Sequence, residues 1–382
     1  MKLKLALLGC GSISKAHWAG IIERAPEIEV TTLIDINLSN AEELAKLMNK
    51  NPDIFSSFED ALIKGDFDAV DIMLPHHLHE EAAIVAFKAG KHVLLEKPIA
   101  PTLAACSRIF AAAKKAAEKN NTVFMVGENA QYWPEIREVK RLIDSGAIGE
   151  IQTAMANFIF PFDETVRQMM VNQWRSRLAQ MGGGIVIDGG SHWLRPLRMW
   201  MGEIHSVAAA TQPSRKELEG ESLCHAILRF QSGKIAYFGA NMVSSHTALQ
   251  PWWKITGDKG EIWIESGFQG RLLLVNADYP DPAGKQIMEP QGYFASFGYQ
   301  LHDFSQAILH EKPLDANPES ALMDLETIHT LYRAAKTQRW EQTAPLSTEG
   351  LMDNSLFATA QKINQKSIKE QESVALVGCA KL

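Results

Sequence analysis

The sequence predicts an α/β protein in which a doubly wound parallel sheet is followed by a second α/β domain with a large, mostly antiparallel open sheet. Three observations support this prediction. Short apolar strands alternate with helical stretches through the first third of the chain, a pattern typical of a parallel sheet covered on both faces. A glycine turn joins the first strand to the first helix. Beyond residue 127, strand-like segments follow one another without a helix after each.

Strands and helices alternate in residues 1–127, which we expect to form one domain. Apolar and β-branched runs predict strands at 3–8, 29–35, 69–74, 92–95 and 122–126. Helices are expected between them at 13–24, 39–48, 79–89 and 102–118. Ser39 and Ser57 are suitable N-caps, the first for the second helix and the other for a further short helix. Short connections and right-handed crossovers then give a doubly wound sheet.

Residues 128–345 are expected to form a second domain, and residues 346–382 a C-terminal extension. Strands are predicted at 151–159, 206–211, 224–230, 234–243, 252–256 and 261–265. Helices are predicted at 134–145, 184–201, 295–310 and 318–337. These helices are too few to cover both faces of the sheet, and an open apolar face would be covered by another subunit. We therefore expect a homo-oligomer, either a dimer or a tetramer.

The composition is that of a globular protein, and it narrows the choice of partners. Of 382 residues, 46% are hydrophobic and 22% are charged, and the formal net charge is −7. Such a chain lacks the basic face that nucleic acids need, and no apolar run is long enough to span a membrane. The four cysteines lie far apart, which indicates reduced thiols in the cytoplasm. Ala380-Lys381-Leu382 resembles a peroxisomal targeting signal and leaves the peroxisome as an alternative.

The glycine loop between the first strand and the first helix predicts a dinucleotide site. Gly9 and Gly11 permit a tight turn and a close approach of the backbone to a pyrophosphate, and Ser12 and Ile13 open the helix behind them. Ser14 stands where the usual third glycine would be. The strand–turn–helix context at the start of a βαβ series favours cofactor binding over a bare structural turn.

Asp35 ends the second predicted strand and follows the glycine loop by slightly over twenty residues. A carboxylate there can accept hydrogen bonds from the adenosine ribose hydroxyls and would repel a 2′-phosphate. No arginine follows it immediately. We therefore expect NAD rather than NADP. The alternative is an aspartate at the approach to a helix, without a ligand.

A series of motifs, in a specific order and spacing, resembles one family of oxidoreductases. These motifs are Gly9-Cys10-Gly11, Pro75 with His79, Glu96-Lys97-Pro98, Asn129 with Pro134, Ser145 to Glu150, Trp174-Arg175, Gly182-Gly183-Gly184 with Asp188 and His192, and Gly257 with Lys259-Gly260-Glu261. The chain resembles the Gfo/Idh/MocA family, named for glucose–fructose oxidoreductase and inositol dehydrogenase, from residue 2 to about residue 340.

The resemblance implies a Rossmann domain and then an α/β domain whose open sheet often forms the subunit interface. It also implies oxidation or reduction of a sugar-like or polyol carbon by NAD(P). Lys97 would contact both substrate and nicotinamide, and Glu96 would lie near the nicotinamide ribose. Asp188 and His192 would be the acidic and the proton-transfer residue. The expected cofactor-binding residues are Gly9, Gly11, Ser12, Ile13, Asp35, Pro75, His76, His79, Glu96 and Lys97. The expected substrate-binding residues are Gln131, Tyr132, Trp174, Arg175 and His192.

Three positions depart from the usual pattern of the family. Gln131 and Tyr132 stand where the family often has an arginine and a phenylalanine, and Arg195 stands where an acidic residue often follows the histidine. These positions border the substrate pocket in the family. The substrate of a named member therefore cannot be assigned to this chain.

The candidate catalytic residues have the chemistry that these roles require. Asp188 and His192 are four residues apart on a predicted helix, so the carboxylate could orient the imidazole as a general base. Lys97 follows a strand end, where its cation could stabilise an alkoxide. The alternatives are a helix-face hydrogen bond and a surface lysine.

The neighbouring histidines do not require a metal. His76, His77 and His79 follow Pro75 at the end of a strand, where contacts with the cofactor loop or ordinary capping fit them better. We expect no metal site there.

The expected function is hydride transfer between the nicotinamide of NAD and a carbinol carbon of a sugar, a sugar derivative or a cyclitol. One alternative is an enzyme that holds NAD tightly and uses it transiently for elimination or glycoside cleavage, with the same Lys97 and His192. Another is a non-catalytic NAD-sensing regulator, which would not need a proton-transfer pair.

Overall fold

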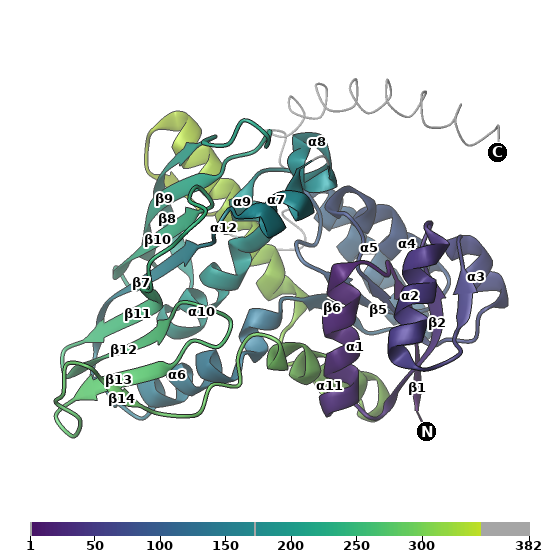
Figure 1. Cartoon of the computed structure of the whole chain (residues 1–382), viewed down its shortest axis with the longest axis horizontal. Coiled ribbons are helices and arrows are strands. Elements are labelled where there is room, and N and C mark those ends of the chain that lie inside the picture. Colours follow the sequence, from purple (N-terminus) through teal and green to yellow (C-terminus); the bar gives the residue numbers. More distant parts are fainter. Residues whose placement is uncertain (1, 172, 345–382) are drawn as a thin grey trace.

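The computed structural model describes residues 2–171 and 173–344, which form two sheets (Figure 1). The first sheet has six parallel strands in the order β3-β2-β1-β4-β5-β6. This order confirms the doubly wound Rossmann architecture, with its switch point between β1 and β4. The strands are β1 (Leu3–Leu8), β2 (Ile28–Ile34), β3 (Asp53–Phe55), β4 (Ala69–Ile72), β5 (His92–Glu96) and β6 (Phe124–Gly127). Only β3 was not predicted, because three residues are too few to show a pattern.

The helices of this region agree with the predicted ones except in one capping residue. They are α1 (Ser12–Arg24), α2 (Leu38–Met48), α3 (Phe58–Lys64), α4 (His79–Lys88) and α5 (Leu103–Asn120), with a 3₁₀ turn η1 (His76–Leu78) before α4. Ser57 caps α3 as expected, accepting a hydrogen bond from the Asp60 N–H at 3.2 Å. Ser39 was wrong as a cap, because it lies inside α2 and donates to Asn37, the extended residue that caps the helix.

The second sheet has nine strands in the order β14-β13-β12-β11-β7-β10-β9-β8-β15. Only β7 and β10 are parallel neighbours, so the expected mostly antiparallel sheet is confirmed. Its strands are β7 (Ile151–Ile159), β8 (Ile204–Gln212), β9 (Leu223–Phe230), β10 (Ile235–Asn241), β11 (Pro251–Gly257), β12 (Gly260–Glu265), β13 (Leu272–Asn276), β14 (Lys285–Gln286) and β15 (Glu341–Gln342). The last three were not predicted, and two of them, β14 and β15, have only two residues each and lie at the sheet edges.

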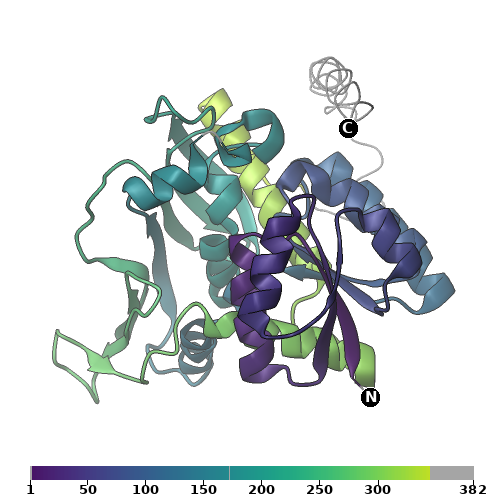
Figure 2. The ribbon, with the colours of Figure 1, turned by 45° about the vertical axis from the view of Figure 1, so that its right-hand side comes forward.

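Helices cover one face of the nine-stranded sheet and connect it to the N-terminal region. The longer ones are α6 (Pro134–Asp144), α10 (Ser191–Met201), α11 (Ala295–His310) and α12 (Pro318–Thr337). The shorter ones are η2 (Asn129–Tyr132), α7 (Glu164–Met170), η3 (Trp174–Ser176), α8 (Leu178–Met181) and α9 (Ile185–Gly189). Helices α10 and α12 lie between the two sheets (Figure 1), and α11 returns to pack beside α1 (Figure 2).

The single helix predicted at 184–201 is two helices in the structure. Helix α9 ends at Gly189, and α10 starts at Ser191. A Cβ at Gly190 would lie 2.3 Å from the main-chain oxygen of Val186, so the chain can make this close turn only with glycine there. Asp188 and His192 therefore do not lie on one continuous helix.

Several expectations concern residues outside the described ranges. The C-terminal extension at 346–382, with Cys379 and the tripeptide Ala380-Lys381-Leu382, lies there. Among the helices that the structure describes, none is long and apolar enough to cross a membrane. The cysteines within the described ranges, Cys10, Cys106 and Cys224, are buried free thiols.

A buried charge cluster joins α10 to α12 behind the candidate site. Asp324, 1% exposed, accepts a hydrogen bond from Arg195 Nε at 2.8 Å and another from Arg198. Arg198 also reaches Glu203 through Nη2 at 2.8 Å. Removing one partner of such a cluster leaves charge without compensation in a medium of low dielectric constant.

We predict that Asp324→Asn lowers the free energy of unfolding by about 3–5 kcal/mol, because two guanidinium groups lose their shared counter-charge. Urea denaturation measures the change. Asp144→Asn is the control, since Asp144 forms an exposed pair with Lys140 on α6 and its loss should change stability by less than about 1 kcal/mol. Equal, small effects of both variants would contradict the prediction.

Candidate active site

The glycine loop forms a cradle for an anion at the start of α1. Gly9 has φ +96°, and a Cβ there would lie 2.5 Å from the main-chain oxygen of Met73. A Cβ at Gly11 would meet nothing within 4 Å, so this side of the loop is open. Helix α1 has neither a side-chain cap nor an acidic residue in its first turn, as far as the described residues show. Its free N–H groups and positive dipole end fit a pyrophosphate.

Asp35 stands beside this loop, as a ribose-binding carboxylate requires. Its Oδ2 accepts the N–H of Cys10 at 2.8 Å, and its Oδ1 accepts the N–H of Asn37 at 2.8 Å. Ser14 replaces the third glycine without opening the turn, because its hydroxyl donates to the Gly11 carbonyl at 2.6 Å. The residues present therefore fit a dinucleotide.

Two of the predicted cofactor-binding residues, His76 and His79, contact main-chain carbonyls of other segments. His79 is fully buried, with Nδ1 2.8 Å from the Pro98 carbonyl and Nε2 2.8 Å from the Leu74 carbonyl. Burial lowers the pKa of His79 to about 4, and a neutral ring can donate a hydrogen bond to only one of these two carbonyls, which belong to the loops after β4 and β5. His76 is also buried and lies 3.0 Å from the Met181 carbonyl through Nδ1. The Lys97–Pro98 bond that follows β5 is cis.

Lys97 and Asp188 lie together at the carboxyl end of β5. Lys97 Nζ donates to the main-chain oxygen of Asp188 at 2.6 Å. The Asp188 carboxylate accepts from Arg175 Nε at 3.2 Å and lies 3.6 Å from His76 Nε2. Burial opposes the ionisation of Asp188, but the charge of Arg175 and the contact with His76 outweigh it and hold the pKa of Asp188 well below its usual range.

The partner of His192 is Glu128, and the predicted pairing with Asp188 was wrong. His192 Nδ1 lies 2.5 Å from Glu128 Oε1, and Glu128 is 1% exposed. Burial would raise the pKa of Glu128, but the charge and hydrogen bond of His192 lower it to about 2. The break at Gly190 leaves Asp188 beside Arg175 instead. Glu128 directly follows β6, and its place at a strand end is the signal that could have indicated it.

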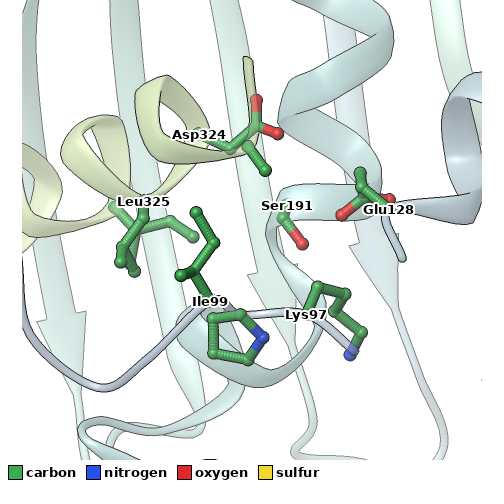
Figure 3. A pocket seen from close by; sticks show the side chains of 9 residues that line it. Lys97, Ile99, Glu128, Ser191, Asp324 and Leu325 are labelled. Atoms are coloured by element: carbon green, nitrogen blue, oxygen red, sulfur yellow. The ribbon is translucent and has the colours of Figure 1, made fainter. Parts of the chain in front are cut away.

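A small cavity adjoins this pair (Figure 3). Its volume is about 10 Å³, close to that of one water molecule. Glu128 Oε2 and Ser191 Oγ are buried without a hydrogen-bond partner among the described residues. Both residues line the cavity, as do Lys97, Pro98, Ile99, Ala321, Asp324, Leu325 and Ile328. The catalytic candidates are therefore closely packed on this side.

Trp174 and Arg175 lie next to His76 and Asp188. The Trp174 ring lies edge-on to His76 with centroids 4.5 Å apart, and the guanidinium carbon of Arg175 lies 4.3 Å from the centre of that indole. Tyr293 is a neighbour that the sequence did not indicate, with its ring 5.9 Å from that of His192.

Gln131 and Tyr132 do not join them. The Gln131 amide contacts Arg195 and the main-chain oxygen of Asp315, the latter at 2.6 Å. The buried Tyr132 donates to Asp303 at 2.5 Å and lines a separate cavity of about 360 Å³. Two departures from the family's pattern, Gln131 and Arg195, are thus bonded to each other.

Within residues 2–171 and 173–344, no three histidine, cysteine or acidic side chains lie close enough together to hold a metal ion. His77 lies exposed on the turn before α4.

Two models of one oxidoreductase family match the chain. Residues 3–127 match the model described as the oxidoreductase family with an NAD-binding Rossmann fold, and residues 136–263 match the GFO/IDH/MocA C-terminal domain. The chain is also similar to a dTDP-3,4-didehydro-2,6-dideoxy-alpha-D-glucose 3-reductase of Actinomadura kijaniata. The two are 24% identical, over 83% of this chain and 91% of the reductase.

Two further proteins extend the comparison. The levoglucosan dehydrogenase of Pseudarthrobacter phenanthrenivorans is 30% identical over 54% of this chain and 53% of its own length. The WlbA dehydrogenase of Bordetella pertussis, solved with NADH and UDP-GlcNAcA, has the same fold, with a TM-score of 0.77 and 22% identity over 91% of this chain and 99% of that one. Since both family models match in order along two sheets of the expected topology, the chain belongs to the GFO/IDH/MocA family of NAD-binding oxidoreductases.

Proposed function

We propose that this protein transfers a hydride between the nicotinamide of NAD and a carbinol carbon of a sugar, a sugar derivative or a cyclitol. One observation carries the proposal: a lysine and a histidine–glutamate pair lie at the carboxyl ends of β5 and β6, at the same edge of the sheet as the glycine loop. The printed names of the relatives, a sugar reductase and a levoglucosan dehydrogenase, support the substrate class.

His192 is the proposed general base in the oxidative direction. Its Nδ1 is engaged by Glu128, which leaves Nε2 as the ring nitrogen to take the proton of a substrate hydroxyl. Glu128 holds the ring in place and stabilises the imidazolium that forms. Lys97 Nζ, held by the Asp188 carbonyl, steadies the alkoxide. Bound NAD supplies the hydride acceptor.

Trp174 and Arg175, which lie beside His76 and Asp188, are the proposed substrate-binding residues. The indole offers an apolar face to a sugar ring, and the guanidinium already pairs with Asp188. Gln131 and Tyr132 are left out, because their polar groups are bonded elsewhere. We also propose a cytoplasmic location, which suits the buried thiols of Cys10, Cys106 and Cys224.

A screen of sugars, sugar phosphates and inositols with NAD tests the proposed function. NADH formation is followed by absorbance, and the products are identified by chromatography. Net NADH with an oxidised product supports the proposal. A converted substrate without net NADH would instead indicate transient use of bound NAD. NAD binding without conversion of any substrate would indicate a regulator.

We predict that Lys97→Ala and His192→Ala each lower kcat by about 100-fold or more, since each removes a group that acts only in the transition state. NAD binding, measured by calorimetry, should persist in both. His77→Ala is the control: His77 is exposed, and its loss should change kcat by less than about threefold. Near-normal turnover of His192→Ala at neutral pH would refute its assignment as the base.

The same measurement of kcat tests whether Glu128 is the partner of His192. Glu128→Gln should lower kcat by about tenfold or more, because a neutral amide cannot stabilise the imidazolium. Asp188→Asn should cost less, since the main-chain oxygen that holds Lys97 is unchanged. The reverse order of effects would contradict the pairing of Glu128 with His192.

We predict a preference for NAD over NADP that depends on Asp35. Asp35→Asn keeps an oxygen for the Cys10 N–H but removes the charge that repels a 2′-phosphate. The ratio of kcat/KM for NAD to that for NADP should therefore fall by about tenfold. If the unchanged protein used NADP equally well, the prediction would fail.

We predict a homo-oligomer built on the uncovered face of the nine-stranded sheet. That face carries Ile227, Ile235 and Tyr237. Arg229 lies on it too, with its guanidinium carbon 5.2 Å from the ring centre of Trp340. Ile227 and Ile235 are 38% and 44% exposed, an apolar area that a second subunit would bury.

Light scattering at micromolar concentration should give at least twice the mass of one chain. Ile227→Lys should shift it toward the monomer, while Ile63→Lys, on the exposed side of α3, should not. A monomeric unchanged protein would exclude this interface.

A further inference from the structure

A histidine that the proposed mechanism does not use lies between the glycine loop and the Lys97 strand. His17 lies in α1 and is fully buried. Its Nδ1 is 2.6 Å from Asp71 Oδ2, and its Nε2 is 2.9 Å from Glu96 Oε1. Asp71 lies in β4, and Glu96 is the last residue of β5. One ring therefore bridges a helix and two central strands.

The geometry indicates that His17 is charged. An ionised carboxylate only accepts hydrogen bonds, and a neutral imidazole donates through one nitrogen only. Burial raises the pKa of Asp71 against the opposing effect of His17, whereas the pKa of Glu96 is lowered because His17 outweighs burial. When both carboxylates are ionised, one at each nitrogen, the ring is an imidazolium. From α11 the ring meets Phe297, with centroids 5.0 Å apart, which adds no charge. Burial alone would lower the pKa of His17, but Asp71 and Glu96 outweigh it and raise the pKa to about 10.

Glu96 has a second contact besides the one with His17. Its Oε2 accepts the N–H of Lys97 at 3.1 Å, so both carboxylate oxygens are engaged inside the protein. On the β6 side Gly127 leaves room for this carboxylate, because a Cβ there would lie only 3.1 Å from Glu96 Oε1. A change in the His17 contact would therefore be passed directly to the backbone of Lys97.

We propose that His17 is a positioning residue that acts through Glu96. It ties the end of β5, and with it Lys97, to the helix that follows the glycine loop. The two ends of the dinucleotide site are thereby joined by one buried ionic link. This inference rests on the function proposed above, because its consequence is the placement of Lys97 for the reaction. Small displacements of a reacting group reduce rates strongly.

Two variants separate positioning from simple stabilisation. His17→Gln removes the positive charge that lies between the Asp71 and Glu96 carboxylates. We therefore expect kcat to fall by about 10- to 100-fold, with little change in the substrate KM. The midpoint of thermal unfolding should fall too. Adding Asp71→Asn removes one of the two uncompensated charges and should recover the thermal midpoint. It should not recover kcat, because Glu96 still lacks its cation. Joint recovery of both would overturn the proposal, as would an unchanged kcat in His17→Gln.

A third measurement does not require turnover. Nitrogen NMR of histidine-labelled protein should show one imidazole with both nitrogens protonated from about pH 6 to about pH 9, a signal that His17→Gln removes. A His17 ring that titrates within this range would overturn the proposal. If no substrate is found for the unchanged protein, the proposed function fails, whereas the NMR signal and the thermal midpoints still decide whether His17 is the buried cation of this link.

Discussion

The candidate site depends on the direction of the strands in the six-stranded sheet. Because the strands are parallel, β1, β4, β5 and β6 all end at one edge, and the residue after each strand faces the same space. Gly9, Lys97 and Glu128 are placed by three of these ends. The second sheet needs only to bring α9 and α10 against this edge to add Asp188 and His192. The chemistry is therefore shared between residues at the strand ends and residues of α9 and α10.

Burial of charge is the second constraint, and pairing satisfies it. A carboxylate taken from water is costly unless a cation or several donors meet it. Glu128 has His192, Asp188 has Arg175, and Asp324 has two arginines. These pairs hold the charged side chains of the site in fixed positions. A pre-arranged set of charges is what stabilises a developing alkoxide without reorganisation at the moment of reaction.

The sequence predicted the class of both sheets and most of their strands, together with the glycine loop, because these depend on local patterns, but it did not show β3, β13, β14 or β15. Strand–helix alternation and the spacing from Gly9 to Asp35 are visible along the chain. The partner of His192 could not be recognised along the chain. Helical spacing indicated Asp188, but the turn at Gly190 interrupts that helix. His17 was missed for a different reason. Its partners are 54 and 79 residues away, and only the folded sheet brings them together.

The bond between Gln131 and Arg195 bears on the choice of substrate. In the family pattern these positions often carry the opposite arrangement, an arginine at the first and an acid at the later one. Here the arginine sits on α10, and its charge is neutralised by Asp324 on α12 rather than presented to a ligand. The side of the pocket that α10 supplies is then left with Ser191 and His192 as its polar groups. We propose that selectivity depends on Trp174 and Arg175, which remain partly exposed. The substrate of this protein is therefore to be sought among molecules that suit an indole and a guanidinium.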